Sequence, residues 1–182
     1  MTPGEYFRKM GGTGHGAPPA VRWSEIAWSW LGSFLGIGAL ALIGHWVFTP
    51  QDQPFLLASF GASAMLVYGA IRSPLAQPRN LLGGHILSAI VGVTCWKWLG
   101  HIPYLAEALS VSTAVAVMHA TRTLHPPGGA TALLAIIGSN KIHAMGYYYV
   151  LIPAMLGPLV LLIVALLVNN LSASRQYPES WF

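Results

Sequence analysis

Residues 26–48 read IAWSWLGSFLGIGALALIGHWVF, a run of 23 residues without Asp, Glu, Lys or Arg. At a rise of about 1.5 Å per residue, a helix of this length crosses a hydrocarbon core of about 30 Å. The whole composition agrees, because 54% of the 182 residues are hydrophobic and only 8% are charged, against roughly 25% in a soluble domain. The sequence therefore predicts an all-α membrane protein and excludes a water-soluble globule.

Five further apolar blocks follow this run. They cover residues 55–71, 81–99, 105–121, 126–138 and 146–169. The blocks at 55–71 and 126–138 are short for a membrane crossing and carry Gly or Pro. We expect six membrane segments, including two short half-helices. An arrangement of four crossing helices, in which both short blocks enter and leave by the same face, stays open.

Two short strings suggest an internal repeat. Residues 61–66 read GASAML and residues 129–134 read GATALL, with identical residues at four of the positions. Paired short segments interrupted by Gly or Pro are typical of transporter sites, although small-residue packing faces would also produce such a match. We expect one domain over residues 1–182, with two inverted three-segment repeats at 25–100 and 101–170 and tails at 1–24 and 171–182.

The basic residues predict the orientation. If the N-terminus is cytoplasmic and all six blocks cross, only Lys97 and Lys141 lie outside. The remaining bases all fall on the cytoplasmic side: Arg8, Lys9, Arg22, Arg72, Arg79, Arg122 and Arg175. The positive-inside rule then predicts cytoplasmic termini in a cell membrane, such as the bacterial inner membrane.

Composition also indicates the partners. The sequence has no basic run that would bind nucleic acid, so the lipid bilayer is the expected environment. The small polar surface leaves room for a homo-oligomer, and no heptad sets its number of subunits.

The polar residues that interrupt the apolar frame predict a site. Residues 122–131 read RTLHPPGGAT, in which Pro126 and Pro127 cannot continue the preceding helix. A new helix can start beyond them, and Gly128, Gly129 and Ala130 would leave its first N–H groups uncovered. Because the helix dipole makes this end positive, we expect an anion site there.

The second string predicts a matching half. Gly61, Ala62 and Ser63 would start another half-helix that faces the first one near the middle of the membrane. The hydroxyls of Ser63 and Thr131 would then donate to the bound anion beside the backbone N–H groups. His125, at the mouth of the second half-helix, would add positive charge when it is protonated.

These residues also carry a family resemblance. The strings HPPGGATA at 125–132, SFGASA at 59–64 and QPRNLLGGH at 77–85 resemble the HPP family of integral membrane proteins. Plant plastid and cyanobacterial members of that family transport nitrite, so the resemblance implies nitrite transport here. Many members carry appended CBS domains, and we expect this chain to hold the membrane module alone.

Other polar residues have two interpretations each. Arg79 could guide an anion or anchor its helix, and Asn80 could contact substrate or cap the helix N-terminus. His85 lies inside an apolar block, where an ionisable group is a functional candidate. His119 and Arg122 are candidate pathway residues, and His119 could share a proton path with His125.

Three classes of function follow. A transporter or channel for a small monovalent anion, foremost nitrite, is favoured; a pore for a small neutral solute is the alternative. A membrane enzyme built on the histidines lacks a nucleophile, an acid pair and a ligand set, so we expect no enzyme. No acid or Cys accompanies the histidines at a ligand spacing, so we expect neither a metal nor a cofactor. Residues 147–149, all Tyr, are expected to form an aromatic belt.

Overall fold

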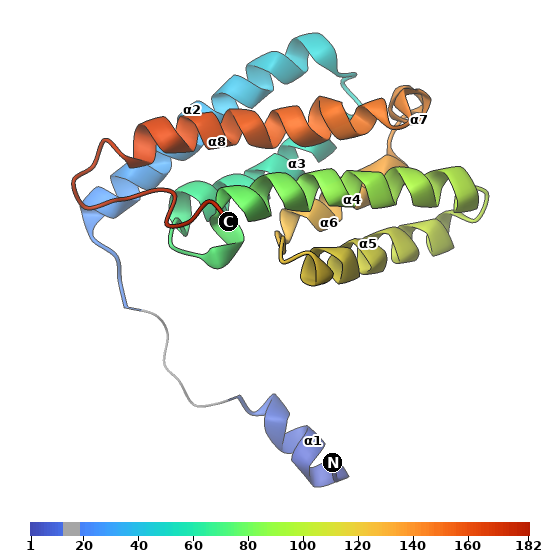
Figure 1. The fold of residues 1–182 in the computed structure, drawn as a ribbon, viewed down its shortest axis with the longest axis horizontal. Helices are drawn as coiled ribbons and strands as arrows, with labels where there is room; N and C mark the ends of the chain where they lie inside the picture. The colour runs from blue at the N-terminus through green and yellow to red at the C-terminus, as the bar shows by residue number, and fades with distance from the viewer. Residues whose placement is uncertain (13–18) are drawn as a thin grey trace.

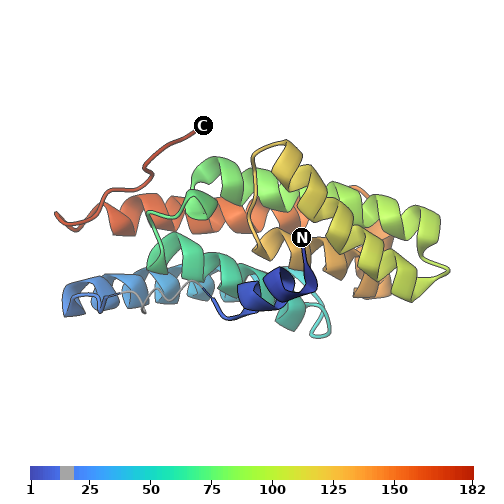
Figure 2. The same cartoon turned by 90° about the horizontal axis from the view of Figure 1, so that it is seen from below.

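The computed structural model describes residues 1–12 and 19–182, and the regular elements of these residues are all helices. The α-helices are α1 (Pro3–Met10), α2 (Trp23–Val47), α3 (Gln53–Ala64), α4 (Pro78–Leu99), α5 (Pro103–Ala120), α6 (Pro127–Ile137), α7 (Asn140–Met145) and α8 (Leu156–Asn169). Three short helical turns complete them: η1 (Met65–Gly69), η2 (Pro74–Ala76) and η3 (Val150–Met155). The longer helices lie side by side (Figures 1 and 2), and α1 lies apart from them (Figure 1).

Prolines in the first turn start four of the helices that lie side by side, and Pro3 starts α1 in the same way. Pro54, Pro78, Pro103 and Pro127 occupy the first or second position of α3, α4, α5 and α6. Proline fits there because the first turn of a helix has no use for its missing N–H. The predicted break before the second short helix is confirmed, since α5 ends at Ala120 and α6 begins at Pro127.

Among the residues that the structure describes, two helical stretches meet the length and composition of a membrane span. They are Trp23–Val47, with a mean hydropathy of 1.8, and Val150–Asn169, with a mean hydropathy of 2.8. The order long, short, long occurs in both halves, as α2, α3, α4 and as α5, α6, α8. The all-helical fold is thus established, while six crossings and an inverted repeat stay predictions.

Hydrogen bonds between residues at or near the helix ends define two ends of the bundle. At one end, the Lys141 ammonium donates to the Val47 carbonyl at 2.8 Å, and the Ser139 N–H donates to Asp52 at 2.9 Å. At the other end, the Arg79 guanidinium donates to the Thr121 carbonyl at 2.9 Å. The N-terminus of α2 and the C-terminus of α8 also lie at this second end of the bundle (Figure 1).

Small residues let the helices approach closely. Gly32 and Gly36 of α2 lie against the ring of Tyr68, so that a Cβ on either residue would clash with it. Gly157 of α8 lies in the same way against the ring of Phe60. These faces are small-residue packing surfaces of the kind that membrane helices use.

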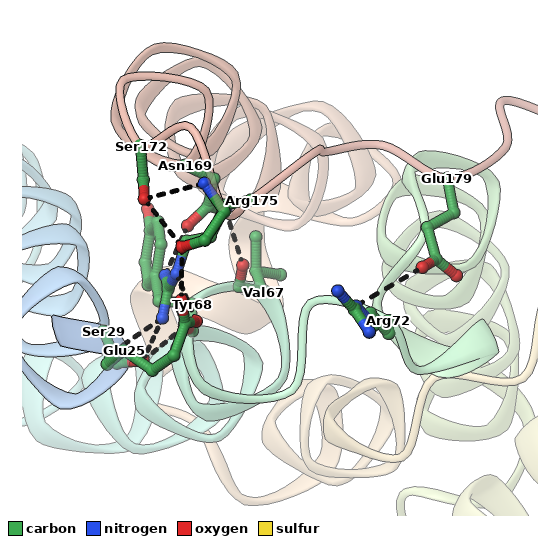
Figure 3. A network of polar contacts seen from close by, with 10 residues as sticks. Glu25, Ser29, Val67, Tyr68, Arg72, Asn169, Ser172, Arg175 and Glu179 are labelled. Atoms are coloured by element: carbon green, nitrogen blue, oxygen red, sulfur yellow. Dashed lines mark hydrogen bonds and ion pairs between the residues drawn. The ribbon is translucent and has the colours of Figure 1, made fainter. Parts of the chain in front are cut away.

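A charged cluster joins the C-terminal tail to this packing. Arg175, whose side chain is 2% exposed, forms an ion pair with Glu25 at 2.8 Å and also bonds Ser29 and Asn169 (Figure 3). Its guanidinium further donates to the Tyr68 carbonyl. We call Arg175, Glu25, Ser29 and Asn169 the Arg175 cluster; it ties the ends of α2 and α8 to the end of η1.

Candidate functional site

Five polar side chains meet in the interior, between α3, α4 and α6. Each of them is at most 3% exposed, and we call them the His85–His125 cluster: Ser59, Ser63, His85, His125 and Thr131. Ser59 and Ser63 come from α3, His85 from α4 and Thr131 from α6, while His125 precedes α6. Four of the five are predicted site residues, and the fold brings them together from distant parts of the sequence.

His85 joins the two similar strings. Its Nε2 lies 2.8 Å from the Ser63 hydroxyl, and its Nδ1 lies 2.7 Å from the Thr131 hydroxyl. Ser63 is the third residue of GASAML and Thr131 is the third residue of GATALL. The two strings therefore meet, but through their hydroxyls and one imidazole rather than through helix N-termini.

His125 extends this chain of hydrogen bonds. Its Nε2 lies 2.9 Å from the Ser63 hydroxyl, and its Nδ1 lies 2.8 Å from the Leu75 carbonyl. A carbonyl can only accept, so we assign the proton of the neutral ring to Nδ1. Nε2 is then an acceptor for the Ser63 hydroxyl.

Two residues at the site, Ser59 and Tyr149, were not predicted as site residues from the sequence. The Ser59 hydroxyl donates to the Pro127 carbonyl at 3.0 Å and lies 3.2 Å from the Thr131 hydroxyl. Ser59 precedes Ser63 by one helical turn, so the i, i+4 spacing could have revealed it. Tyr149 is fully buried and donates to the Thr131 carbonyl at 2.9 Å, so its assignment to an aromatic belt is wrong.

Two glycines allow the histidines to approach each other. A Cβ on Gly84 would lie 2.5 Å from the Cβ of His125, and a Cβ on Gly128 would lie 2.8 Å from the Gly84 carbonyl oxygen. The close contact of α4 with the start of α6 leaves the two imidazole centroids 5.1 Å apart. Gly128 therefore allows close packing of α4 and α6, whereas the sequence predicted that it would leave an N–H group uncovered for an anion.

The predicted helix start at Gly61 is wrong. Helix α3 begins at Gln53, so Gly61, Ala62 and Ser63 lie in its last turn. Pro54 sits in the first turn, and no breaker follows it before Gly61, so the helix runs through the string without interruption. Gly61 is half-buried and Ala62 is exposed. Only Ser63 of this string reaches the cluster.

The predicted anion site on free N–H groups is also wrong. The N–H of Gly128 donates to the His125 carbonyl at 2.8 Å, and the N–H of Gly129 donates to the Pro126 carbonyl at 3.0 Å. Pro126 already has helical torsion angles, with φ −51° and ψ −37°, so hydrogen bonding begins with the first turn. Ala130 faces outward and is exposed.

The remaining candidates lie outside the cluster. The helix α4 is preceded by Gln77 at its N-cap, and Asn80 instead donates to the Leu124 carbonyl at 2.9 Å, so the N-cap interpretation of Asn80 is wrong. Arg79 is exposed and anchored to the Thr121 carbonyl. His119 and Arg122 are exposed too, and neither contacts His125 by a hydrogen bond.

The polar groups of the cluster satisfy one another and nearby backbone carbonyls without a carboxylate. Within the described part of the chain, every buried side-chain nitrogen and oxygen has a hydrogen-bond partner. The hydrogen bonds of His85 and His125 go to hydroxyls and a carbonyl, with no carboxylate among them. Its groups can donate and accept hydrogen bonds, and its imidazoles can gain a proton.

Comparison with known proteins supplies the family. The family model described as the HPP transmembrane region matches residues 18–178. A transmembrane protein of Dictyostelium discoideum is 45% identical over 181 residues, which cover 98% of this chain and 58% of that protein. A second transmembrane protein of the same organism is 43% identical over 182 residues, which cover 98% of this chain and 64% of that protein.

The chain thus spans about three fifths of the length of these relatives. No solved structure matches it. The family match covers most of the chain, including all three strings that resemble the HPP family. The chain is an integral membrane protein and belongs to the HPP transmembrane family.

Proposed function

We propose that this protein transports a small monovalent anion, foremost nitrite, along a path through the His85–His125 cluster. One observation carries the proposal: two imidazoles and three hydroxyls are buried together within an apolar helix bundle. Polar and ionisable groups inside a membrane protein are costly, and they commonly mark a path for a substrate or a proton.

The chemistry of the cluster suits a small oxyanion. The hydroxyls of Ser59, Ser63 and Thr131 are donors that can turn from their present partners toward the oxygens of nitrite. Such a site binds weakly, and a transport pathway needs a site that the substrate can leave. The exposed Arg79 and Arg122 would raise the local anion concentration at one end of the bundle.

We propose transport rather than catalysis. Ser63 lies beside two imidazoles, which is the arrangement of an activated nucleophile, but no carboxylate orients either ring. His125 is held by a backbone carbonyl and His85 by the Thr131 hydroxyl. These partners suit neutral rings that pass hydrogen bonds along a chain.

Nitrite influx into liposomes that contain the purified chain tests the proposal. Ser63→Ala removes the hydroxyl that both imidazoles share, and we expect influx to fall about tenfold, the effect of one hydrogen bond of about 1.4 kcal/mol. Ser112→Ala is the matched control, because the Ser112 hydroxyl is exposed and bonds only its own helix. Its influx should equal that of the wild type.

Two results would overturn the proposal. The first is wild-type influx no faster than in protein-free liposomes, and the second is equal influx in the Ser63→Ala variant and the wild type. Parallel measurement of urea influx decides the alternative, because a neutral-solute pore would pass urea faster than nitrite.

We also propose six crossings in two inverted repeats, with both termini cytoplasmic in a bacterial inner membrane. The long, short, long helix order in both halves supports the repeats, and the arginine-rich end supports the orientation. Cysteines introduced at Gln51 and Ser73 of a Cys95→Ser chain test this. Only Gln51→Cys should react with an impermeant thiol reagent added outside intact cells; the reverse pattern would contradict the orientation.

A further inference from the structure

We infer that the His85–His125 cluster takes up one proton with each anion, so that the protein is an electroneutral proton–anion symporter. The inference rests on the proposed function and deepens it, because it names the second substrate. It follows from the hydrogen bonds that the cluster forms with zero and one additional proton, and from the charge repulsion that a second proton would meet.

The neutral cluster has one consistent arrangement of hydrogens. The Leu75 carbonyl fixes the proton of His125 on Nδ1, so the Ser63 hydroxyl donates to Nε2 of His125. Ser63 then accepts from Nε2–H of His85 at 2.8 Å. The Nδ1 of His85 consequently accepts from the Thr131 hydroxyl at 2.7 Å.

One added proton fits without the loss of a contact. With both nitrogens of His85 protonated, Nδ1–H donates to the Thr131 oxygen and the Thr131 hydroxyl turns to Ser59 at 3.2 Å. The Ser59 hydroxyl donates onward to the Pro127 carbonyl at 3.0 Å. The proton fits His125 less well, since the Ser63 hydroxyl would have to stop donating to His125 and turn to the more distant Ser59 carbonyl at 3.3 Å.

A second added proton does not fit in the same way. The two imidazole centroids are 5.1 Å apart, and both rings share the Ser63 hydroxyl. Two positive charges at this separation inside an apolar bundle repel each other strongly. The cluster therefore has room for a single proton.

Residues 1–12 and 19–182, which the structure describes, supply no counter-charge for that proton. Their acids are engaged or located elsewhere: Glu25 pairs with Arg175, Asp52 bonds Ser139, and Glu179 lies 3.9 Å from Arg72. Glu5 caps α1 and Glu107 lies in the second turn of α5.

The other titratable groups around the cluster also contribute no negative charge. The hydroxyls of Tyr68, Tyr149 and Tyr177 donate to the carbonyls of Leu161, Thr131 and Ala76. Among the cations, Arg79 at the start of α4 bonds the Thr121 carbonyl, and Lys97 at the end of α4 lies over the Tyr147 ring.

A buried imidazolium without a counter-ion is unstable, and so is a buried anion without a cation. Binding both together yields a neutral pair, in which the anion replaces the missing carboxylate. The anion and the proton therefore stabilise each other in the site, and one proton should cross with each anion.

Simultaneous recording of nitrite and pH inside liposomes tests the inference. Potassium gradients with valinomycin set the membrane potential, and protein-free liposomes correct for leakage of nitrous acid. We expect equal numbers of protons and nitrite ions to enter. The rate should rise severalfold when the outside is acidified by one pH unit, and a change of membrane potential should not alter it.

Variants locate the proton. His85→Gln retains hydrogen bonding to Ser63 and Thr131 but cannot be protonated, so acceleration by outside acid should disappear. His101→Gln, at an exposed histidine, is the matched control, and its nitrite influx should still be accelerated by outside acid. Nitrite influx that follows the membrane potential and carries no protons would overturn the inference alone. No nitrite influx in the wild type would overturn the proposed function and the inference together.

Discussion

The Arg175 cluster and the His85–His125 cluster are both buried polar networks, yet they differ in charge balance. Arg175 is paired with the Glu25 carboxylate at 2.8 Å, and its other donors reach Ser29, Asn169 and the Tyr68 carbonyl. The histidine cluster contains hydroxyls and imidazoles, and no carboxylate bonds its rings. One network has a permanent charge with a permanent partner, and the other can acquire a charge that has no partner.

The difference separates a structural role from the transport role that we propose. A paired charge gains nothing from an outside ion, so the Arg175 cluster holds helix ends together. An imidazole that lacks a counter-ion can respond to an incoming anion. A buried polar group within the membrane is therefore not enough to indicate a transport site. The feature that distinguishes the histidine cluster is the lack of a counter-ion for a protonated ring.

The largest expected effect is on stability, from Arg175→Met. Removal of the buried guanidinium leaves the Asn169 side-chain oxygen without its donor and leaves Glu25 with the Ser174 hydroxyl alone, which should lower the unfolding free energy by about 3 kcal/mol. Thermal unfolding in detergent measures this loss. The ratio of protons to nitrite in the folded fraction should stay unchanged.

The double variant Glu25→Gln with Arg175→Met serves as the control for the Arg175 prediction. It removes both charges, so part of the stability should return. A change of the proton-to-nitrite ratio in the single variant would break the proposed separation between the two clusters.

A smaller loss of stability is expected from Gly128→Ala. The added Cβ would lie 2.8 Å from both the Gly84 carbonyl oxygen and the Ser88 hydroxyl, so α4 and α6 must separate. We expect the unfolding free energy to fall by about 2 kcal/mol, and nitrite influx to fall with it. Gly38→Ala in α2 is the matched control, because nothing lies within 4 Å of its Cβ position. Equal stability of both variants would contradict the close packing at the cluster.

The smallest effect on stability is expected at Asp52, a third polar site, where hydrogen bonds stabilise the charged carboxylate. Burial raises the pKa of Asp52, but hydrogen bonds from Ser139 and Thr49 outweigh burial and hold the pKa below its ordinary value of 3.8. The carboxylate thus adds stability above pH 3.8, and this stability is lost as the pH falls through the lower folded pKa.

Asp52→Asn should therefore cost about 1 kcal/mol at pH 7 and less at pH 3. Detergent unfolding of wild type and variant across that range measures the difference. A difference that stays constant with pH would mean that the carboxylate charge of Asp52 contributes nothing.

The sequence predicted helices best where composition alone determines them. The apolar block at 26–48 became α2, and the block at 146–169 contains the second clear span. Pro126 and Pro127 marked a helix break correctly, because proline acts through its own backbone. The hydroxyls of Ser63 and Thr131 and the ring of His85, all candidates from the sequence, lie together in the fold, and their role in binding stays a prediction.

Tertiary contacts explain what the sequence could not predict. A string such as GASAML contains no signal for the helix start eight residues earlier at Gln53, so Gly61 was misplaced. The inward turn of Tyr149 depends on an acceptor at Thr131, which only the folded chain provides. The Leu75 carbonyl, which orients His125, is likewise invisible in a motif.

Proton uptake on nitrite binding is the sharpest test of coupling between the proton and the anion. The purified protein in weakly buffered detergent, near neutral pH, is mixed with nitrite while a pH indicator reports the protons absorbed. We expect nitrite binding to take up protons, in a number that approaches one per nitrite where both rings are neutral before binding, and we expect His85→Gln to remove most of this uptake. Nitrite binding without proton uptake, or equal uptake by His85→Gln and wild type, would contradict it.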